Sequence, residues 1–444
     1  METEIKVTSS YCIVLMPFTI RPYRRFPVCC QMTYHHGDFE GRGKIGKNRL
    51  KEPMTNINRI VKLAVFLCAV VLAGCQSIVV PCSDPRDSCY EHKEQRMYRG
   101  IQQYNIIAPN NEYSISSGEP RYRVWYGTNR KPLDENNPWI GFSNSRDQVI
   151  HYGTAYVFVP KSHQFGSVGS WWITRMVTLN DDRLRIRDIE RLNEANFIRR
   201  MRDSLAAKNA GTRKALVYIH GYNVTFDEAI IRAAQIGFDL KVEGITAVYS
   251  WPSQGAFLGY SADEATVESS AEHVKEFLAR IALETDAEEV NVIAHSMGNR
   301  AFLRAVTSLA PVMRKAGKKF GQIILAAPDV DVELFKQLAS VYPNISTRTT
   351  MYVSSKDLAI KTSELLHRYY RVGLYPPITT IPGIDTIQVS KVDLTLLGHS
   401  YFANTEAVLR DMFELIRGNP APKNRNRLFP HPSASNVEYW EIGP

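Results

Sequence analysis

A serine in the second half of the chain has neighbours that suit a nucleophile. Ser296 lies in the pentapeptide AHSMG at residues 294–298, after the apolar run 290–293 and before a stretch with helical spacing. A serine on a sharp turn between a strand and a helix exposes its hydroxyl above a sheet. Small residues two positions before and after it leave room for that turn, and Ala294 adds one methyl group where glycine is usual. The pattern predicts that Ser296 is a nucleophile; the alternative is a loop serine that caps the helix.

A nucleophilic serine needs a general base, and His399 has a suitable position. It follows the last expected strand and precedes the last expected helix. Imidazole titrates near neutrality and can take a proton from a serine hydroxyl. The nearest rival, His367, lies in a helix-like segment, and a solvent-exposed loop histidine is the alternative role for His399.

The acid that holds the imidazole tautomer is the most open choice. We favour Asp357, which follows the expected strand 349–355. Asp329 and Asp331, which follow the preceding strand, are the alternatives. We expect these two carboxylates to cap the next helix or to shape the site.

Acyl transfer also needs donors that face the developing oxyanion, and backbone N–H groups serve this purpose. We expect one donor from Met297, the residue after the serine, and the second from Tyr222. Tyr222 lies in a His-Gly-Tyr-Asn segment that follows the expected strand ending at residue 220. His220 itself is expected to brace this loop rather than to act as the base.

Alternating strands and helices must position these residues. Aromatic and β-branched runs predict early strands, and a helix follows them; from residue 214 onward strands and helices alternate. This order predicts an α/β fold with a mostly parallel sheet, helices on both faces and no space for a large cap domain. The site residues all follow strands, at the edge where parallel sheets bind ligands. The expected strands are 121–126, 152–159, 170–179, 214–220, 245–251, 290–295, 319–327, 349–355 and 386–392, and the expected helices are 193–206, 226–240, 265–283, 300–314, 332–341 and 404–416.

The N-terminal part of the chain contains an apolar run at residues 60–74. It is shorter than the roughly 20 residues that span a bilayer. Arg59 precedes the run, Lys62 lies near its start, and small residues end it. This is the layout of an export signal. The alternative is a short buried helix. Because such a signal begins naturally at Met54, we expect residues 1–53 to lie outside the physiological protein.

Charge and cysteine positions agree with export. The net charge of +9 is concentrated before residue 75, and no dense basic cluster follows, so we do not expect a nucleic-acid partner. After Cys75 only Cys82 and Cys89 remain, and they form either a short disulfide loop or two free thiols. No metal or organic cofactor is expected.

Five motifs resemble those of a bacterial family of esterase/lipase-like α/β-hydrolases. They are YGTNR at 126–130, IHGYN at 219–223, SWPS at 250–253, AHSMGN at 294–299 and LAAPD at 325–329. The resemblance covers residues 121–416 and implies the α/β-hydrolase fold, whose chain order of serine, acid and histidine is met here. By this resemblance Ser296, Asp357 and His399 form the triad, and Tyr222 and Met297 form the oxyanion hole.

Residues 72–75 (LAGC) resemble a bacterial lipoprotein box. This likeness implies that Cys75 carries lipid and that, with Gln76 after it, the protein is anchored in the outer membrane and faces the periplasm. The expected segments are then an extension (1–53), a signal (54–74), a tether (75–120), the hydrolase domain (121–416) and a coil tail (417–444).

The combined prediction is an envelope lipoprotein that hydrolyses carboxylic esters, small or lipid-like, through an acyl-enzyme on Ser296. Two alternatives remain open. One is a catalytically silent binding or scaffold protein on the same fold, and the other is an acyltransferase that uses the same triad. The sequence makes no prediction about the oligomeric state.

Overall fold

The computed structural model describes residues 113–116, 119–163, 165–167, 183–256, 259–354, 369–389, 402–433 and 437–443. The chain divides into units 1–90 and 91–444, and all the described residues belong to the second. None of the described helices is long and apolar enough to cross a membrane. Several sequence predictions lie outside the described residues: the signal, Cys75, Cys82, Cys89, Asp357, His367 and His399.

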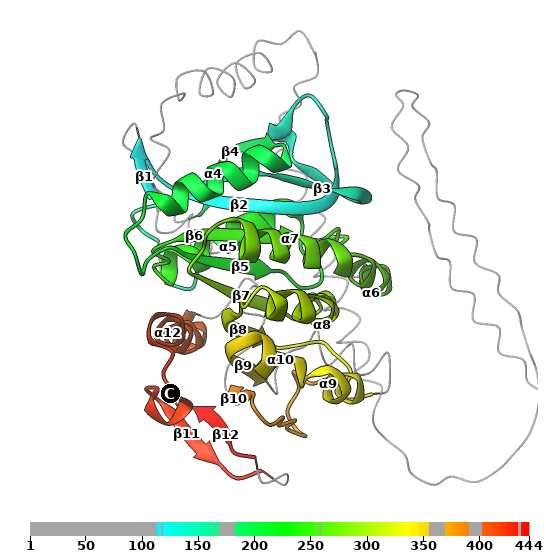
Figure 1. Ribbon diagram of the computed structural model, residues 1–444, viewed down its shortest axis with the longest axis vertical. Coiled ribbons are helices and arrows are strands. Elements are labelled where there is room, and N and C mark those ends of the chain that lie inside the picture. Colours follow the sequence, from blue (N-terminus) through cyan, green and yellow to red (C-terminus); the bar gives the residue numbers. More distant parts are fainter. Residues whose placement is uncertain are drawn as a thin grey trace, which may run out of the picture. The chain divides into compact units, whose positions relative to one another are not determined.

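A single twisted sheet forms the framework of the described part (Figure 1). Its strand order is β11-β12-β10-β9-β8-β7-β5-β6-β2-β3-β4, and β1 pairs with β2. All pairs from β12 to β2 along this order are parallel, whereas β1, β3, β4 and β11 pair antiparallel with their neighbours. The strands are β1 (Tyr113–Ser116), β2 (Glu119–Pro132), β3 (Phe142–Phe158), β4 (Arg185–Leu192), β5 (Lys214–Ile219), β6 (Ile245–Ser250), β7 (Glu289–His295), β8 (Phe320–Ala326), β9 (Ser346–Ser354), β10 (Asp385–Val389), β11 (Leu428–His431) and β12 (Tyr439–Ile442).

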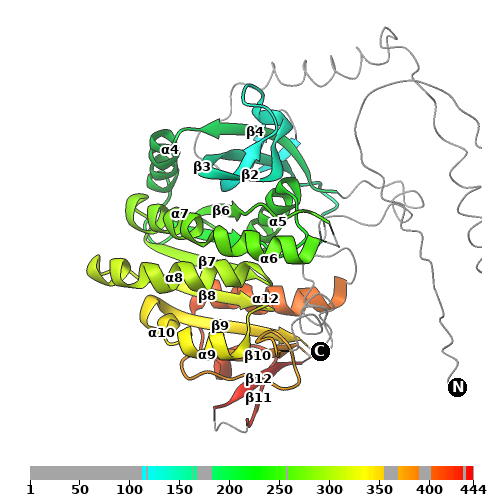
Figure 2. The ribbon, with the colours of Figure 1, turned by 90° about the vertical axis from the view of Figure 1, so that its right-hand side faces the viewer.

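Helices cover both faces of the sheet, as the alternation predicts (Figure 2). One apolar core lies under α4, α7, α8, α9 and α10, and the other lies under α5 and α12. The central strands are buried on both faces, so their sequences are apolar without alternation. The helices are α4 (Glu194–Ala206), α5 (Phe226–Asp239), α6 (Tyr260–Ser269), α7 (Ala271–Glu284), α8 (Gly298–Lys315), α9 (Val332–Leu338), α10 (Val341–Ile345) and α12 (Phe402–Gly418), with short 3-10 turns η1 (Pro138–Ile140) and η3 (Pro422–Asn424).

Two predicted helices are divided in the structure. The expected helix 265–283 is α6 followed by α7, with Ser270 between them. The Ser270 hydroxyl donates to the Thr266 carbonyl and accepts from the Asn129 amide, a tertiary contact that no local pattern contains. The expected helix 332–341 is likewise α9 followed by α10.

Both predicted ends of the domain are wrong. The coil expected at 417–444 contains η3, β11 and β12, and β12 extends the sheet by pairing with β10. Pro430 in β11 is compatible with that strand because β11 has a partner on one side only. At the other end, β1 and the start of β2 lie before residue 121. β1 is held by pairing with β2, and β11 and β12 by pairing with each other and with β10, so the sequence of each short strand carries little signal by itself.

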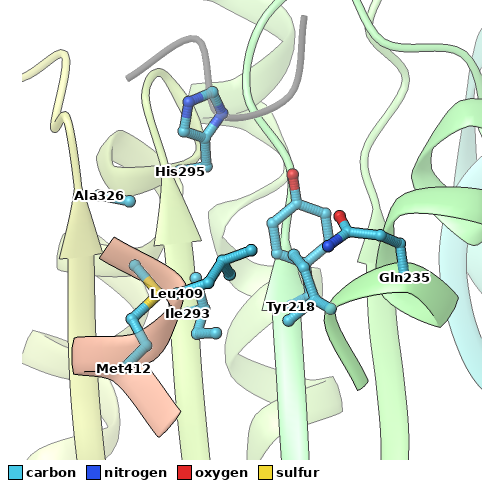
Figure 3. A pocket seen from close by; sticks show the side chains of 8 residues that line it. Tyr218, Gln235, Ile293, His295, Ala326, Leu409 and Met412 are labelled. Atoms are coloured by element: carbon cyan, nitrogen blue, oxygen red, sulfur yellow. The ribbon is translucent and has the colours of Figure 1, made fainter. Parts of the chain in front are cut away.

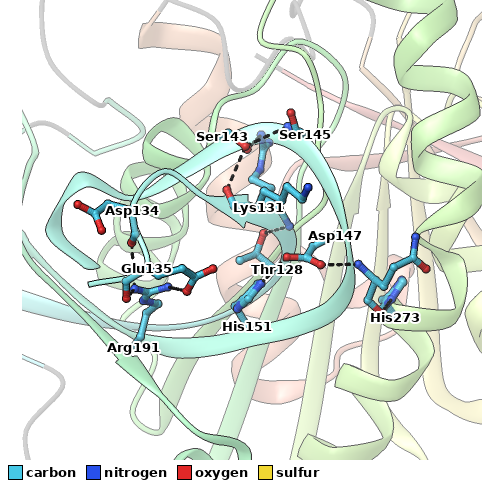
Figure 4. A network of polar contacts seen from close by, with 12 residues as sticks. Thr128, Lys131, Asp134, Glu135, Ser143, Ser145, Asp147, His151, Arg191 and His273 are labelled. Atoms are coloured by element: carbon cyan, nitrogen blue, oxygen red, sulfur yellow. Dashed lines mark hydrogen bonds and ion pairs between the residues drawn. The ribbon is translucent and has the colours of Figure 1, made fainter. Parts of the chain in front are cut away.

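A polar network stiffens the hairpin between β2 and β3 (Figure 4). Ser143 donates to the Lys131 carbonyl, and the Asp147 carboxylate contacts His151 at 3.0 Å. Arg191 of β4 pairs with Glu135 at 2.9 Å on the same hairpin. These contacts fix the end of β2, the strand that carries the YGTNR motif.

Candidate active site

Ser296 occupies a strained turn between β7 and α8. Its φ angle is +49°, a left-handed conformation that costs a non-glycine residue roughly 1–3 kcal/mol. The backbone around it resists relaxation. The Ser296 N–H donates to the Ala326 carbonyl at 2.9 Å, and the Ser296 carbonyl accepts from the N–H groups of Asp329 and Asn299, both at 3.1 Å. The sequence prediction of a sharp strand-to-helix turn at this serine is therefore met.

Close packing explains the glycines near Ser296. A Cβ atom on Gly298 would lie 2.3 Å from the His220 carbonyl oxygen, and one on Gly221 would lie 2.9 Å from Ser296 Cβ. A side chain at position 298 would displace the backbone, and one at position 221 would displace the side chains of His295 and Ser296. Ala294, by contrast, is fully buried inside β7 and its methyl group is accommodated. The departure from glycine at the first position of the motif is thus compatible with the turn.

The two expected oxyanion donors come from segments beside Ser296. Met297 is the N-cap of α8, and its N–H donates no hydrogen bond to any other part of the described chain. Tyr222 follows Gly221, whose Cα is packed against Ser296, and Tyr222 stacks at a tilt on Tyr260. The sequence prediction placed both groups at this edge of the sheet, and the structure brings their segments together.

His220 braces the loop, as expected. Its Nδ1 lies 2.7 Å from the Gly221 carbonyl oxygen and its Nε2 lies 3.3 Å from Ser250 Oγ. The ring stacks on Trp251, whose indole N–H donates to the His220 carbonyl at 2.8 Å. Burial, and then the positive charge of Arg130, lower the pKa of His220 to about 3. A neutral imidazole bound on both sides is suited to support rather than to accept a proton from Ser296.

The alternative acids have different structural roles. Asp331 caps α9 by accepting from the N–H groups of Glu333 and Leu334, both at 3.0 Å, so its predicted capping role is confirmed. Asp329 is buried and does not cap that helix. Its carboxylate accepts from the Tyr260 hydroxyl at 2.6 Å.

Two arginines complete a buried cluster around Asp329. Arg300, in the first turn of α8, donates to the Asp329 carbonyl at 2.7 Å and to the Tyr260 hydroxyl at 2.9 Å, and pairs with Glu264. Arg371 approaches the Asp329 carboxylate at 3.6 Å. The cluster locks the segment whose N–H group binds the Ser296 carbonyl. No local sequence pattern marks Arg300, Arg371 or Tyr260 as site residues, because their partners are distant along the chain.

Two cavities lie near the turn. One is apolar, has a volume of about 20 Å³ and lies between α5, α12 and the ends of β5, β7 and β8 (Figure 3). This is close to the volume that a single water occupies, so this cavity by itself is too small for an acyl chain. The other, of about 240 Å³, lies beside the Asp329 cluster and is lined by Arg300, Arg371 and the apolar face of α9. Within the described ranges, no group of three or more His, Cys, Asp or Glu residues is arranged to hold a metal ion.

The family described as alpha/beta hydrolase of unknown function (DUF900) matches residues 194–417, half of the chain. The chain belongs to this family. The α/β-hydrolase fold expected from the sequence is therefore confirmed, and this protein is a hydrolase by family. The YGTNR motif lies before the matched residues. No curated protein matches the chain.

Two solved structures that match this chain share little sequence with it. A candidate cell surface hydrolase from Lactobacillus plantarum WCFS1 is 9% identical with a TM-score of 0.30, over 47% of this chain and 94% of its own. LpqC, a poly(3-hydroxybutyrate) depolymerase from Bordetella parapertussis, is 12% identical with a TM-score of 0.29, over 61% of this chain and 86% of its own.

Proposed function

We propose that this hydrolase cleaves carboxylic esters through an acyl-enzyme on Ser296. The observation that carries the proposal is the left-handed turn that holds Ser296 between β7 and α8. Strain of this kind persists where the surrounding structure over-determines it, and it is concentrated at functional sites. Asp357 and His399 complete the proposed triad.

The proposed reaction has two balanced steps. Ser296 Oγ attacks the ester carbonyl carbon while His399 takes the hydroxyl proton, and the Tyr222 and Met297 N–H groups bind the oxyanion. Breakdown of the tetrahedral intermediate breaks the bond to the leaving alcohol, which receives the proton from His399. Water, deprotonated by His399, then attacks the acyl-enzyme and releases the carboxylic acid with return of the proton to Ser296.

Labelling with a fluorophosphonate tests the nucleophile. The wild-type protein is expected to react, and Ser296→Ala is expected not to react. Ser346→Ala is a matched control, because Ser346 is also buried but begins β9, at the opposite edge of the sheet. Equal labelling of wild type and Ser296→Ala would exclude Ser296. A folded wild type that neither labels nor hydrolyses a p-nitrophenyl ester would instead support the binding-protein alternative.

The triad acid is tested by comparing Asp357→Asn with Asp329→Asn in hydrolysis of a short p-nitrophenyl ester. Loss of the correct acid leaves the imidazole in the wrong tautomer, and a fall in kcat of about 10⁴-fold is expected for Asp357→Asn. A larger fall in Asp329→Asn, with the folded fraction unchanged, would transfer the role to Asp329.

We also propose that the hydrolase is anchored in the cell envelope through lipid on Cys75, facing the periplasm from the outer membrane. The support is the signal-like run 60–74 and the LAGC sequence that ends it. Palmitate incorporation by the wild type and its loss in Cys75→Ser is the expected result. Incorporation that persists in Cys75→Ser would overturn the anchor.

A further inference from the structure

Arg130, the last residue of the YGTNR motif, is a buried cation at the end of β2. Only 1% of its surface is exposed. The pairing of β2 with β3 is irregular on both sides of it, between Thr128 and Arg130 and again between Arg130 and Pro132. Such irregularities change the direction of a side chain at the end of a strand. Here the guanidinium reaches the loops that follow β5 and β6.

The Arg130 guanidinium binds neutral oxygen atoms on both of these loops. Its Nη2 donates to the Val224 carbonyl at 2.8 Å, and its Nη1 donates to the Ser253 carbonyl at 3.1 Å. Its Nε donates to Ser250 Oγ at 2.9 Å, the hydroxyl that also contacts His220. One side chain therefore connects the loop of Tyr222 with the SWPS loop and with the histidine that supports them.

A buried carboxylate, opposite in charge to Arg130, forms hydrogen bonds with the same two loops. Asp263 of α6 is fully buried and accepts from the Asn223 N–H at 3.3 Å and the Gln254 N–H at 2.7 Å. It also accepts from the Ser253 hydroxyl at 2.5 Å, whose oxygen accepts from the Val224 N–H at 3.1 Å. Side chains from three other segments thus bind the N–H groups of Asn223 and Val224 and the carbonyl of Val224, the two residues after Tyr222.

We propose that Arg130 is a positioning residue that fixes the Tyr222 N–H toward the oxyanion formed at Ser296. This inference rests on the proposed function. Oxyanion donors act because they are already oriented before charge develops, and a displacement of about 1 Å can cost roughly 100-fold in rate. By holding the Val224 carbonyl and the SWPS loop together, Arg130 removes the freedom of the loop to turn its N–H groups away.

A purely stabilising role does not account for the choice of an arginine. A buried charge is costly unless it is paired, and the hydrogen-bond partners of Arg130 are carbonyl and hydroxyl groups rather than carboxylates. Burial lowers the pKa of Arg130 to about 9, against the smaller opposing effect of the Asp263 charge. Apolar side chains at this position could stabilise the fold equally well. Only a side chain with several N–H donors can bind several carbonyl oxygens in fixed orientations.

Arg130→Lys separates the two roles, because a lysine keeps the charge but cannot reach all the acceptors. Arg425→Lys is the matched control. Arg425 is also fully buried, but it pairs with carboxylates: with Asp411 at 3.0 Å and with Asp385 at 3.4 Å. Asp385 is the first residue of β10, so this pair lies at the opposite edge of the sheet from Ser296. The measurements on the full chain are the second-order rate of fluorophosphonate labelling, kcat and KM for a p-nitrophenyl ester, and Ki for phenylboronic acid. The folded fraction of each variant is measured by circular dichroism.

Arg130→Lys is expected to lower the labelling rate and kcat by about 10- to 100-fold, with KM within twofold of the wild type. The boronate forms a tetrahedral anion on the serine, so its Ki should rise by a similar factor. After correction for folded fraction, Arg425→Lys should stay within twofold in all measurements. Equal values for the two lysine variants would overturn the inference.

Ser253→Ala provides a second test that keeps Arg130 and its carbonyl acceptor on residue 253, while it removes the hydroxyl that donates to Asp263. It removes the acceptor of the Val224 N–H and is expected to lower the labelling rate and kcat by about three- to tenfold without changing KM, relative to Ser346→Ala. If Arg130→Lys does not fold and Ser253→Ala equals its control, the inference fails. Failure of the proposed function looks different, because the folded wild type itself would then neither label nor hydrolyse the ester.

Discussion

The two flanks of Ser296 use buried arginines in opposite ways. On the side of β5 and β6, Arg130 is surrounded by carbonyl and hydroxyl oxygens, and burial lowers its pKa to about 9. On the side of β8, burial also opposes the charge of Arg300, but the charges of Asp329, Tyr260 and Glu264 raise its pKa overall. In the first flank a cation holds the conformation of a loop, and in the second flank cations pair with a carboxylate.

This difference separates effects on rate from effects on stability. Changes at Arg130 leave neutral oxygens without a donor and alter where loop N–H groups point. Changes at Asp329 leave two buried cations, Arg300 and Arg371, without their shared anion. Stability should therefore depend mainly on the Asp329 flank, and oxyanion binding on the Arg130 flank.

The largest change in stability is expected for Asp329→Ala. Removing one member of a buried ion pair costs about 3–5 kcal/mol. In Asp329→Ala, Arg371 would stay buried without this anion, and Arg300 would keep only its pair with Glu264. Urea unfolding followed by circular dichroism measures this loss. Asp329→Asn keeps an acceptor for the Tyr260 hydroxyl and should lose less. A loss below about 1 kcal/mol in Asp329→Ala would remove the contrast between the flanks.

The Arg130 flank should show a pH dependence through His220. Its pKa is about 3 when folded and about 6.5 when unfolded, so the unfolded chain binds a proton between these values and the folded chain does not. The stabilisation is complete above pH 6.5 and is lost as the pH falls. From pH 7 to pH 5 the loss is about 2 kcal/mol.

His220→Gln tests this contribution, because glutamine does not titrate. The free energy of unfolding, measured by urea at pH 7 and at pH 5, should fall less steeply in this variant than in the wild type, by about 2 kcal/mol over the interval. Identical dependence on pH in both proteins would show that folding does not lower the pKa of His220.

The smallest effect is expected for Asp331→Ala, next to the Asp329 cluster but outside it. Loss of this N-cap costs about 1 kcal/mol of stability, and the rate of fluorophosphonate labelling should not change. Thermal unfolding and labelling on the same sample measure both quantities. Loss of labelling in a folded Asp331→Ala protein would instead identify Asp331 as part of the catalytic machinery.

Local sequence signals were sufficient wherever neighbours along the chain decide the structure. The apolar run before Ser296, the small residues around it and the helical spacing after it predict β7, the turn and α8. They were insufficient where a distant partner decides. Ser270 divides α6 from α7 through a contact with Asn129, and β12 is a strand because it pairs with β10.

The sequence by itself determined the α/β alternation, the position of Ser296 and the supporting place of His220, because each depends on residues within one strand-turn-helix unit. Only the tertiary structure decided what Arg130 and Asp329 do. Their partners are separated from them by up to 123 residues and meet them only because parallel strands end at the same edge of the sheet. Buried charges act through the groups that surround them in space, and that environment is a property of the folded chain.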